Sequence, residues 1–357
     1  MKLLHSADWH LDSPIQGRTE EQTALLKAAL LQVPHQVCAA AKAEGCHLML
    51  LAGDLFDGPA SPESIKALRD ALEEVAIPVF IAPGNHDFCS HDSVWRREVW
   101  PENVHLFLSG TMESVLLPAL SCRVYGAAFT AAASDGLLED FRAETDARYT
   151  LGVLHGDPTQ ASSPYCPVTA GQIRDSGLDY LALGHIHKGG SVTEGKTLCA
   201  WPGCPMGRGF DEPEQKGVLV VSLDDSGCRS RFLPLDTPRF YDWTADAGPD
   251  PASTLGQLLP PVGNRDFYRV TLTGEWEAPD TEALRRAFCR FPNLTLRDRT
   301  EPPLDIWAHA GEDSLEGVYF GLLRQQLETA DENTREAILL AARISRQILE
   351  NREVKLP

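Results

Sequence analysis

The sequence predicts an α/β fold, because short apolar runs of strand length alternate with longer stretches of helical periodicity. The runs with the length of buried strands lie at 2–6, 47–52 and 78–82. Between them, apolar residues recur near a 3.6 period over 19–44, where Pro34 predicts a kink or break, and over 61–75. Strands joined by helices run parallel, so their carboxyl ends share one edge of a sheet.

The rest of the chain predicts more strands and two C-terminal parts. Strands at 149–154 and 180–183 again end before polar clusters, whereas those at 197–201 and 217–223 are typical of one hairpin-rich sheet. Residues 236–265 are rich in Pro, Gly and Asp and indicate a boundary. Beyond it we expect a strand, a helix and a strand at 267–272, 281–288 and 294–297, then helices at 313–329 and 333–352.

These elements predict three parts: a main domain at 1–235, a small α+β module at 236–305, and a helical region at 306–357. The first C-terminal helix carries an apolar stripe that begins at Leu315. Such a stripe serves either packing on its own domain or the binding of a partner, and the sequence leaves both readings open.

Composition limits the classes of function. With 357 residues, 43% of them hydrophobic and 23% charged, the chain is typical of a packed soluble protein, and its apolar runs are too short to span a membrane. A candidate ligand at Asp8 leaves no room for a removable signal segment, so we expect a cytoplasmic protein. The nine cysteines show no C-x-x-C pair and predict free thiols. A formal net charge of -19 argues against a broad, sequence-independent grip on nucleic acid by this chain alone.

Five clusters of metal-type ligands follow the predicted strands in order. They are Asp8-Trp9-His10, Gly53-Asp54-Leu55-Phe56-Asp57, Gly84-Asn85-His86-Asp87, His155 and Gly184-His185-Ile186-His187. Each cluster alone is a weak signal, since a single D-x-H or a lone histidine is more often structural. All five at strand ends indicate one site of oxygen and nitrogen ligands, which suits Mn, Fe or Zn better than Ca. Two such ions can clamp a phosphate for hydrolysis.

These clusters resemble the signatures of the calcineurin-like metallophosphoesterase superfamily and, within it, the SbcD-type DNA repair nucleases with their YhaO-like branch. The narrower resemblance rests on Ser6–Leu11, on 53–57, on 182–187 and on Pro202-Gly203-Cys204-Pro205 with the following Gly207-Arg208 and Lys216-Gly217. It is strong from residue 1 to about 225. It implies a four-layer β-sandwich flanked by helices, with a small α+β cap module and a C-terminal helical tail.

The resemblance also implies a role for each residue. Asp8, His10, Asp54 and His187 would surround one cation, and Asp54, Asn85, His155 and His185 the other, with Asp54 shared. His86 would face the substrate, where a histidine can stabilise charge or protonate the leaving oxygen. Asp57 is placed to orient His86, and Asp87 to support its loop by hydrogen bonding. Arg208 is a weaker candidate for phosphate contact, with a structural salt bridge as the alternative.

The function implied is a two-metal, Mn-dependent DNA phosphodiesterase, acting as exonuclease, endonuclease or both. The resemblance further implies an SMC-like coiled-coil ATPase of the SbcC type as partner, and a homodimer. One alternative is a phosphodiesterase acting on a small nucleotide or other phosphoester, against which the long chain beyond residue 200 counts. A second is a non-catalytic scaffold, which the complete ligand set disfavours.

Overall fold

A computed structural model describes residues 1–357 except 214, 264, 278, 353 and 355–357. The chain divides into two compact units, one of Met1–Tyr241 with Arg265–Tyr268, and one of Asp242–Asn264 with Arg269–Pro357. The first unit contains all five ligand clusters.

Two six-stranded sheets form the first unit within the described part of the chain. The first sheet has the order β12 (Gly227–Pro234), β11 (Gly217–Asp224), β1 (Lys2–Ser6), β2 (Leu48–Leu51), β3 (Val79–Ile81) and β4 (Val104–Leu106). In it β1 to β4 are parallel, and β11 is antiparallel to both β1 and β12. The carboxyl ends of β1, β2 and β3 therefore lie at one edge of the sheet.

The second sheet has the order β5 (Glu113–Leu117), β6 (Cys122–Gly126), β7 (Tyr149–His155), β8 (Tyr180–Gly184), β10 (Thr197–Gly203) and β9 (Lys188–Glu194). Its four central strands, from β6 to β10 in this order, are parallel, while β5 and β9 pair antiparallel at the two edges. His155 is the last residue of β7 and Gly184 the last of β8. Two more ligand clusters thus lie at strand ends.

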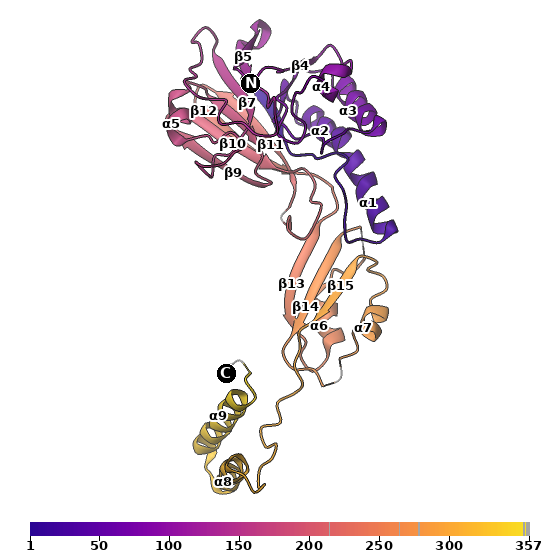
Figure 1. The fold of residues 1–357 in the computed structure, drawn as a ribbon, viewed down its shortest axis with the longest axis vertical. Helices are drawn as coiled ribbons and strands as arrows, with labels where there is room; N and C mark the ends of the chain where they lie inside the picture. Colours follow the sequence, from indigo (N-terminus) through magenta and orange to yellow (C-terminus); the bar gives the residue numbers. More distant parts are fainter. Residues whose placement is uncertain (214, 264, 278, 353, 355–357) are drawn as a thin grey trace. The chain divides into compact units, whose positions relative to one another are not determined.

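Successive side chains of each strand point to opposite faces of its sheet, and the apolar core therefore has three layers. Leu4 and Met49 pack against α1 (Glu20–Leu31), α2 (Val33–Ala43) and α3 (Pro62–Val75), whereas Leu3 and Leu50 pack against the second sheet. The far face of the second sheet is covered by α5 (Ala170–Asp175) and its neighbouring loops. Helices thus lie outside both sheets (Figure 1). This helix–sheet–sheet–helix arrangement confirms the predicted fold class.

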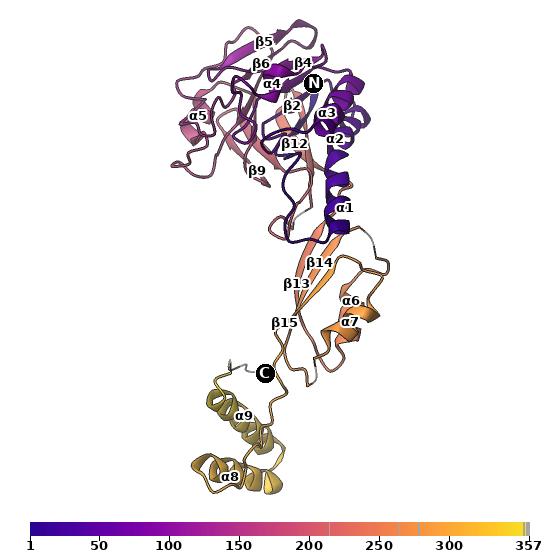
Figure 2. The ribbon, with the colours of Figure 1, turned by 45° about the vertical axis from the view of Figure 1, so that its right-hand side comes forward.

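The predicted helix over 19–44 is two helices. Thr19 caps α1 through a capping box with Gln22, and α1 ends at Leu31. The second helix, α2, starts at Val33, with Pro34 in its first turn, where a missing N–H costs no hydrogen bond. Figure 2 shows α1, α2 and α3 on one side of the unit. The shorter elements α4 (Val94–Arg97) and a 3₁₀ turn at Pro118–Leu120 complete this unit.

One expectation about the sheets is wrong. The strands at 197–201 and 217–223 were expected in one hairpin-rich sheet, yet β10 lies in the second sheet and β11 in the first. Each forms a hairpin with another strand, β10 with β9 and β11 with β12. The segment 204–216 therefore crosses from one sheet to the other, a placement that depends on tertiary pairing and leaves no trace in local periodicity.

In the second part of the chain, a three-stranded sheet has the order β13 (Phe240–Asp246), β14 (Phe267–Thr273) and β15 (Leu294–Asp298). The expected strand, helix and strand correspond to β14, α7 (Thr281–Ala287) and β15. The boundary segment 236–265, however, contains β13 and α6 (Pro251–Leu258), which were missed. Asp250 caps α6 and Pro251 begins it, a start signal that the abundance of Pro and Gly obscured. Two helices follow, α8 (Leu315–Thr329) and α9 (Glu332–Leu349).

Two expectations from composition can be compared with the structure. All nine cysteines are free; seven are buried, Cys228 is half-buried and Cys289 is exposed. The predicted free thiols are therefore confirmed, and most of them are buried. Among the described residues, no helix combines the length and the apolar character that a membrane crossing requires.

The two sheets approach each other closely at their ligand-bearing ends, and a glycine makes this possible. A Cβ atom on Gly184 would overlap the carbonyl oxygen of Ala52, and would lie 2.9 Å from both the Cβ of Ala7 and the Nδ1 of His155. The overlap involves a main-chain atom that cannot rotate away. Gly184 therefore fixes the spacing between the end of β8 and the first sheet.

We predict that Gly184→Ala lowers the free energy of unfolding by about 3 kcal/mol, because the sheets must separate to admit one methyl group. Urea denaturation monitored by circular dichroism measures this loss. Gly171→Ala in α5 is the matched control, since the nearest atom to its new Cβ is 3.9 Å away and alanine favours a helix. Equal stability of the two variants would contradict the close-approach argument.

Candidate metal centre

The loops after β1, β2, β3, β7 and β8 bring the predicted ligands together in strained backbone conformations. Asp8, His10, Asp54 and His185 have positive φ values of 55°, 49°, 52° and 92°. Non-glycine residues rarely adopt this left-handed region, and such residues cluster at functional sites. The strain points these side chains inward from the ends of the strands.

Asp8, His10 and His187 form the first group of ligands, with one donor atom from each lying within 4.8 Å of the others. The Nε2 atoms of His10 and His187 are 3.1 Å apart. His10 is buried, and among the described residues its Nδ1 has no hydrogen-bond partner. Two ring nitrogens that face each other beside a buried carboxylate match the donor set of a transition-metal cation.

Asp8, Asp54 and His155 form the second group, again within 4.8 Å of one another. The Nε2 of His155 lies 3.3 Å from Oδ2 of Asp54 and 2.9 Å from Oδ1 of Asn85. Asp54 is also close to His10, whose Nε2 is 3.8 Å from the same Oδ2. Asp54 therefore stands between the two groups, where a carboxylate that bridges two cations is expected.

Hydrogen bonds to a main-chain carbonyl oxygen and to Glu212 orient two of the histidines. His155 Nδ1 lies 2.9 Å from the carbonyl oxygen of Ala52, and His187 Nδ1 lies 2.7 Å from Oε1 of Glu212. A ring that donates from Nδ1 presents the lone pair of Nε2 to the opposite side, which is the arrangement usual for metal-bound histidine. Both Nε2 atoms point into the ligand groups.

Electrostatics also favour a cation at this place. Burial opposes charge on His155, but Asp54 and Asp8 outweigh burial and raise the pKa of His155 to about 9. Burial likewise raises the pKa of Asp8, while His155 and His10 hold the pKa of Asp54 below its usual range against the effect of burial. Buried carboxylates that hold a proton on a neighbouring ring attract a divalent cation in its place. The donor set thus fits the metal ions that the resemblance implies.

His185 is a predicted ligand whose side chain lies outside the groups of close ligand atoms. Its side chain belongs to none of the groups of mutually close ligand atoms found among the described residues. Its ring centroid lies 5.3 Å from that of His155 and 4.9 Å from that of Tyr165, and its main-chain N–H donates to Asp8 at 2.9 Å. Burial lowers the pKa of His185 to about 4, so the ring is neutral and able to ligate.

His86 and Asp57 form a pair at the edge of the ligand groups, and one ring nitrogen of His86 lies within 4.8 Å of donor atoms of His10 and Asp54, which makes these three residues a further candidate group. His86 Nδ1 is 2.7 Å from Oδ1 of Asp57, and the His86 main-chain N–H donates to Oδ1 of Asp54 at 2.8 Å. The His86 side chain is 45% exposed, whereas Asp54 and His155 are buried. The pair therefore lies at the opening of the site, with the free edge of the imidazole accessible to a substrate.

Asp87 supports the loops that hold these residues. Its buried carboxylate accepts hydrogen bonds from the main-chain N–H groups of Gly84, Asp54, Leu55 and Phe56. One side chain thus joins the loop after β3 to the loop after β2. The predicted supporting role of Asp87 is confirmed.

Arg208 and Glu212 come from the segment between β10 and β11. Arg208 Nη2 is 3.0 Å from Oε1 of Glu212, and Arg208 Nη1 is 3.3 Å from Ser13 Oγ and 4.0 Å from Oδ2 of Asp57. The structure therefore shows Arg208 in a salt bridge, the alternative to phosphate contact. Against the effect of burial, His187 and Arg208 hold the pKa of Glu212 below its usual range. Sequence reasoning missed Glu212, because no motif or period distinguishes one acid in an irregular loop.

Comparisons with known proteins identify the family of this chain. Residues 1–189 match the family model of the calcineurin-like phosphoesterases, and the chain belongs to this family. The chain is 34% identical over 251 residues to the uncharacterized metallophosphoesterase YhaO of Bacillus subtilis, covering 65% of this chain and 60% of the relative. It is 25% identical over 275 residues to the SbcD component of the SbcCD nuclease of Staphylococcus epidermidis, covering 66% of this chain and 70% of that relative.

Among solved structures, a dimetal phosphatase from Danio rerio aligns with a TM-score of 0.40 at 12% identity, covering 65% of this chain and 98% of the other. The predicted family is thus confirmed by the match over residues 1–189. Membership of this family of dimetal enzymes implies two divalent cations, for which the ligand groups around Asp54 provide candidate sites.

We predict that binding of divalent cations releases protons at neutral pH. Because its pKa is raised to about 9, His155 carries a proton that a cation on Nε2 must displace. The protonated form competes with the cation, so the apparent affinity falls as the pH drops below this pKa, by about tenfold per unit for one proton. Isothermal titration calorimetry in buffers of different ionisation enthalpy counts the protons. An affinity independent of pH through the neutral range would contradict the displacement of a proton from His155.

Proposed function

We propose that this protein is a two-metal phosphodiesterase that cleaves DNA as an exonuclease, an endonuclease or both, with Mn as its cation. The observation that carries the proposal is the exposed His86–Asp57 pair beside two ligand groups, with Asp54 Oδ2 close to a histidine of each, 3.8 Å from His10 Nε2 and 3.3 Å from His155 Nε2. We further propose that the protein acts in DNA repair in the cytoplasm, as an SbcD-type nuclease. The name of the Staphylococcus epidermidis relative, part of a nuclease, supports this narrower assignment.

The residues of the chain divide the work between holding charge and moving a proton. When bound, two divalent cations supply Lewis acidity to the scissile phosphoryl group and to a water nucleophile. Asp8, His10 and His187 would hold one, Asn85, His155 and His185 the other, with Asp54 between them. His86, fixed through Nδ1, presents its Nε2 to the leaving oxygen and protonates it or stabilises the developing charge. Asp57 stabilises the protonated ring during this step.

The exposure of His86 favours a polymer over a small phosphoester. A proton donor with 45% of its side chain exposed can meet a phosphate within a long chain. The net charge of -19 would repel such a chain elsewhere on the surface, so cations at the site and a partner protein must supply the attraction. A small nucleotide or other phosphoester remains the alternative substrate. A non-catalytic scaffold would not need this pair or these ligands.

We predict that Asp54→Ala and His86→Ala fail for different reasons. Asp54→Ala loses both cations and all hydrolysis, because it removes the shared carboxylate. His86→Ala keeps the cations and lowers kcat by about 10²- to 10⁴-fold, because it removes a proton donor only. Labelled single- and double-stranded DNA and bis-p-nitrophenyl phosphate with Mn are the substrates, and calorimetry measures the cations.

His91→Ala is the matched control for these variants, since His91 is a surface histidine whose side chain is 98% exposed. Cleavage of DNA that both site variants lose supports the nuclease. Activity on small diesters alone points to the alternative substrate, and inactivity with every metal tried points to the scaffold. Full activity of His86→Ala would refute the role given to His86.

We also propose that the C-terminal helices bind an SMC-like coiled-coil ATPase, while residues 236–305 form a capping module. On α8, the apolar side chains of Leu315, Val318, Tyr319 and Leu322 are exposed, Leu315 by 90%. Phe320 of the same helix is fully buried beside Arg346 of α9, so the pair packs together and still leaves an apolar stripe. Exposed apolar stripes on a helix are typical of partner binding.

We predict that Leu315→Asp/Leu322→Asp, like deletion of 313–357, abolishes co-purification with a co-expressed SbcC-type ATPase. Hydrolysis of bis-p-nitrophenyl phosphate should persist, because the ligands lie in the other unit. Arg324→Ala, an exposed polar change on the same helix, is the control. Unchanged co-purification with the ATPase after the deletion would contradict the docking proposal. The homodimer stays a prediction that light scattering of the purified chain checks.

A further inference from the structure

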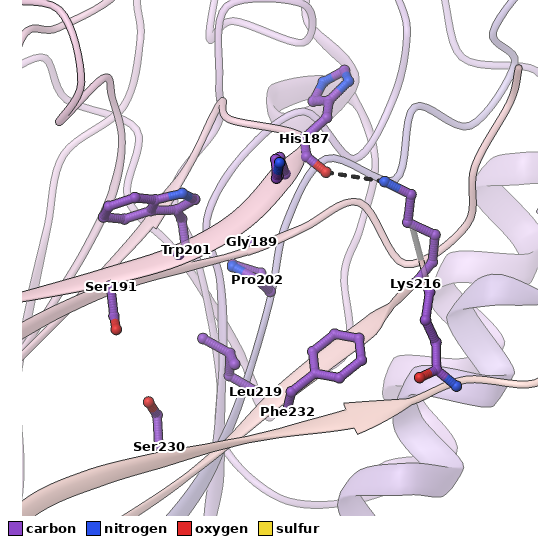
Figure 3. Close-up of a pocket in the computed structure, with 12 residues that line it drawn as sticks. His187, Gly189, Ser191, Trp201, Pro202, Lys216, Leu219, Ser230 and Phe232 are labelled. Carbon is purple, nitrogen blue, oxygen red and sulfur yellow. Dashed lines mark hydrogen bonds between the residues drawn. The ribbon is translucent and has the colours of Figure 1, made fainter. Parts of the chain in front are cut away.

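His187 is held from outside the five ligand clusters, by the segment 204–216 that crosses between the sheets. Its ring Nδ1 lies 2.7 Å from Oε1 of Glu212, and its carbonyl oxygen lies 3.2 Å from Lys216 Nζ and 3.4 Å from the main-chain N of Cys204. Figure 3 shows Lys216 reaching this carbonyl while the His187 ring points away from a pocket of about 400 Å³ lined by Trp201. The main chain and the ring of His187 are thus both fixed by one segment.

Glu212 is placed as an acceptor with little freedom. Its side chain is only 8% exposed, and Oε2 accepts the main-chain N–H of Arg208 at 2.9 Å. Oε1 is shared between His187 Nδ1 at 2.7 Å and Arg208 Nη2 at 3.0 Å. An ionised carboxylate can only accept hydrogen bonds, so the geometry requires a proton on His187 Nδ1.

Arg208 favours the opposite state of His187 Nδ1, a nitrogen without a proton that accepts a hydrogen bond. Its Nη2 lies 3.1 Å from His187 Nδ1, and a guanidinium can only donate. A ring that accepted from Arg208 would carry its proton on Nε2 in the neutral form, and Nε2 is the atom that faces His10. The two neighbours of Nδ1 therefore favour opposite tautomers, and only one of these leaves Nε2 able to bind a cation.

We propose that Glu212 is a positioning residue that sets the tautomer of His187, overruling Arg208 and keeping the Nε2 lone pair directed at the cation site. The inference rests on the metal centre and does not depend on whether the phosphoester is DNA. Arg208 has two opposite effects in this arrangement. It holds the Glu212 carboxylate in place, but without that carboxylate it favours the His187 tautomer that cannot bind a cation through Nε2.

The test compares Glu212→Ala with Glu212→Ala/Arg208→Ala, titrated with Mn²⁺ in the metal-free protein with its whole chain. We expect Glu212→Ala to weaken one of the two cations by about 10- to 100-fold, the cost usual for the loss of such a partner. Removing Arg208 as well should recover a measurable part of that affinity, because the competing donor is gone. If loss of packing alone weakened binding, the double variant would bind Mn²⁺ more weakly than Glu212→Ala.

The tautomer itself is the second readout. Protein labelled with ¹⁵N-histidine at alkaline pH should show His187 protonated on Nδ1 in the wild type and on Nε2 in Glu212→Ala, with His187→Gln identifying the signals. Glu212→Gln keeps the shape of the side chain and an acceptor oxygen, so it should show a smaller loss of affinity in the same direction. Glu212→Gln replaces Glu212→Ala in both measurements if the alanine variant does not fold.

Glu194→Ala is the matched control. It removes a carboxylate paired with Arg174 at 2.8 Å on β9, away from the ligands, and should leave both cations and the tautomer unchanged. Wild-type affinity for both cations in Glu212→Ala, an unchanged tautomer, or a double variant that binds no better than the single one would each overturn the proposal. None of these titrations involves DNA, so they fail or succeed independently of the nuclease assays.

Discussion

The approach of the two sheets at their carboxyl ends is the constraint on which the rest of the site depends. The candidate ligands come from both sheets, Asp8 and Asp54 from the first and His155 and His187 from the second, and they meet where β8 ends against Ala52. Parallel strands bring their ends to one edge within each sheet. Stacking two such sheets face to face doubles the number of loops that reach a common point.

This convergence buries two carboxylates, and their need for a positive partner explains why the site attracts a cation. Asp8 and Asp54 are nearly inaccessible to water, and buried carboxylates are unfavourable without positive partners. Without a cation, the positive partner at hand is His155, whose pKa these carboxylates raise, and a divalent cation would be a stronger one. The fold thus uses strain and burial, which reduce stability, to prepare a place whose natural occupant is a divalent ion.

Much of this could be predicted from the sequence, because the relevant signals are local. A strand that ends in a ligand cluster is visible in a single stretch, as with His47–Ala52 and Asp54, and repetition of the pattern predicts convergence. Glu212 could not be found in this way, since its contact with His187 depends on a chain crossing between sheets. The placement of β10 and β11 was missed for the same reason, and β13 because turn residues surround it.

The support of His187 by segment 204–216 has a consequence for how such proteins diverge. The match to the family model ends at residue 189, and Glu212 lies beyond it, between the Gly207-Arg208 and Lys216-Gly217 motifs of the crossing segment. A connecting segment of this kind tolerates change outside its motifs. Substitutions there would retune one cation while every ligand stays in place. Relatives with identical clusters could then differ in metal preference, and the origin of that difference would lie in the crossing segment.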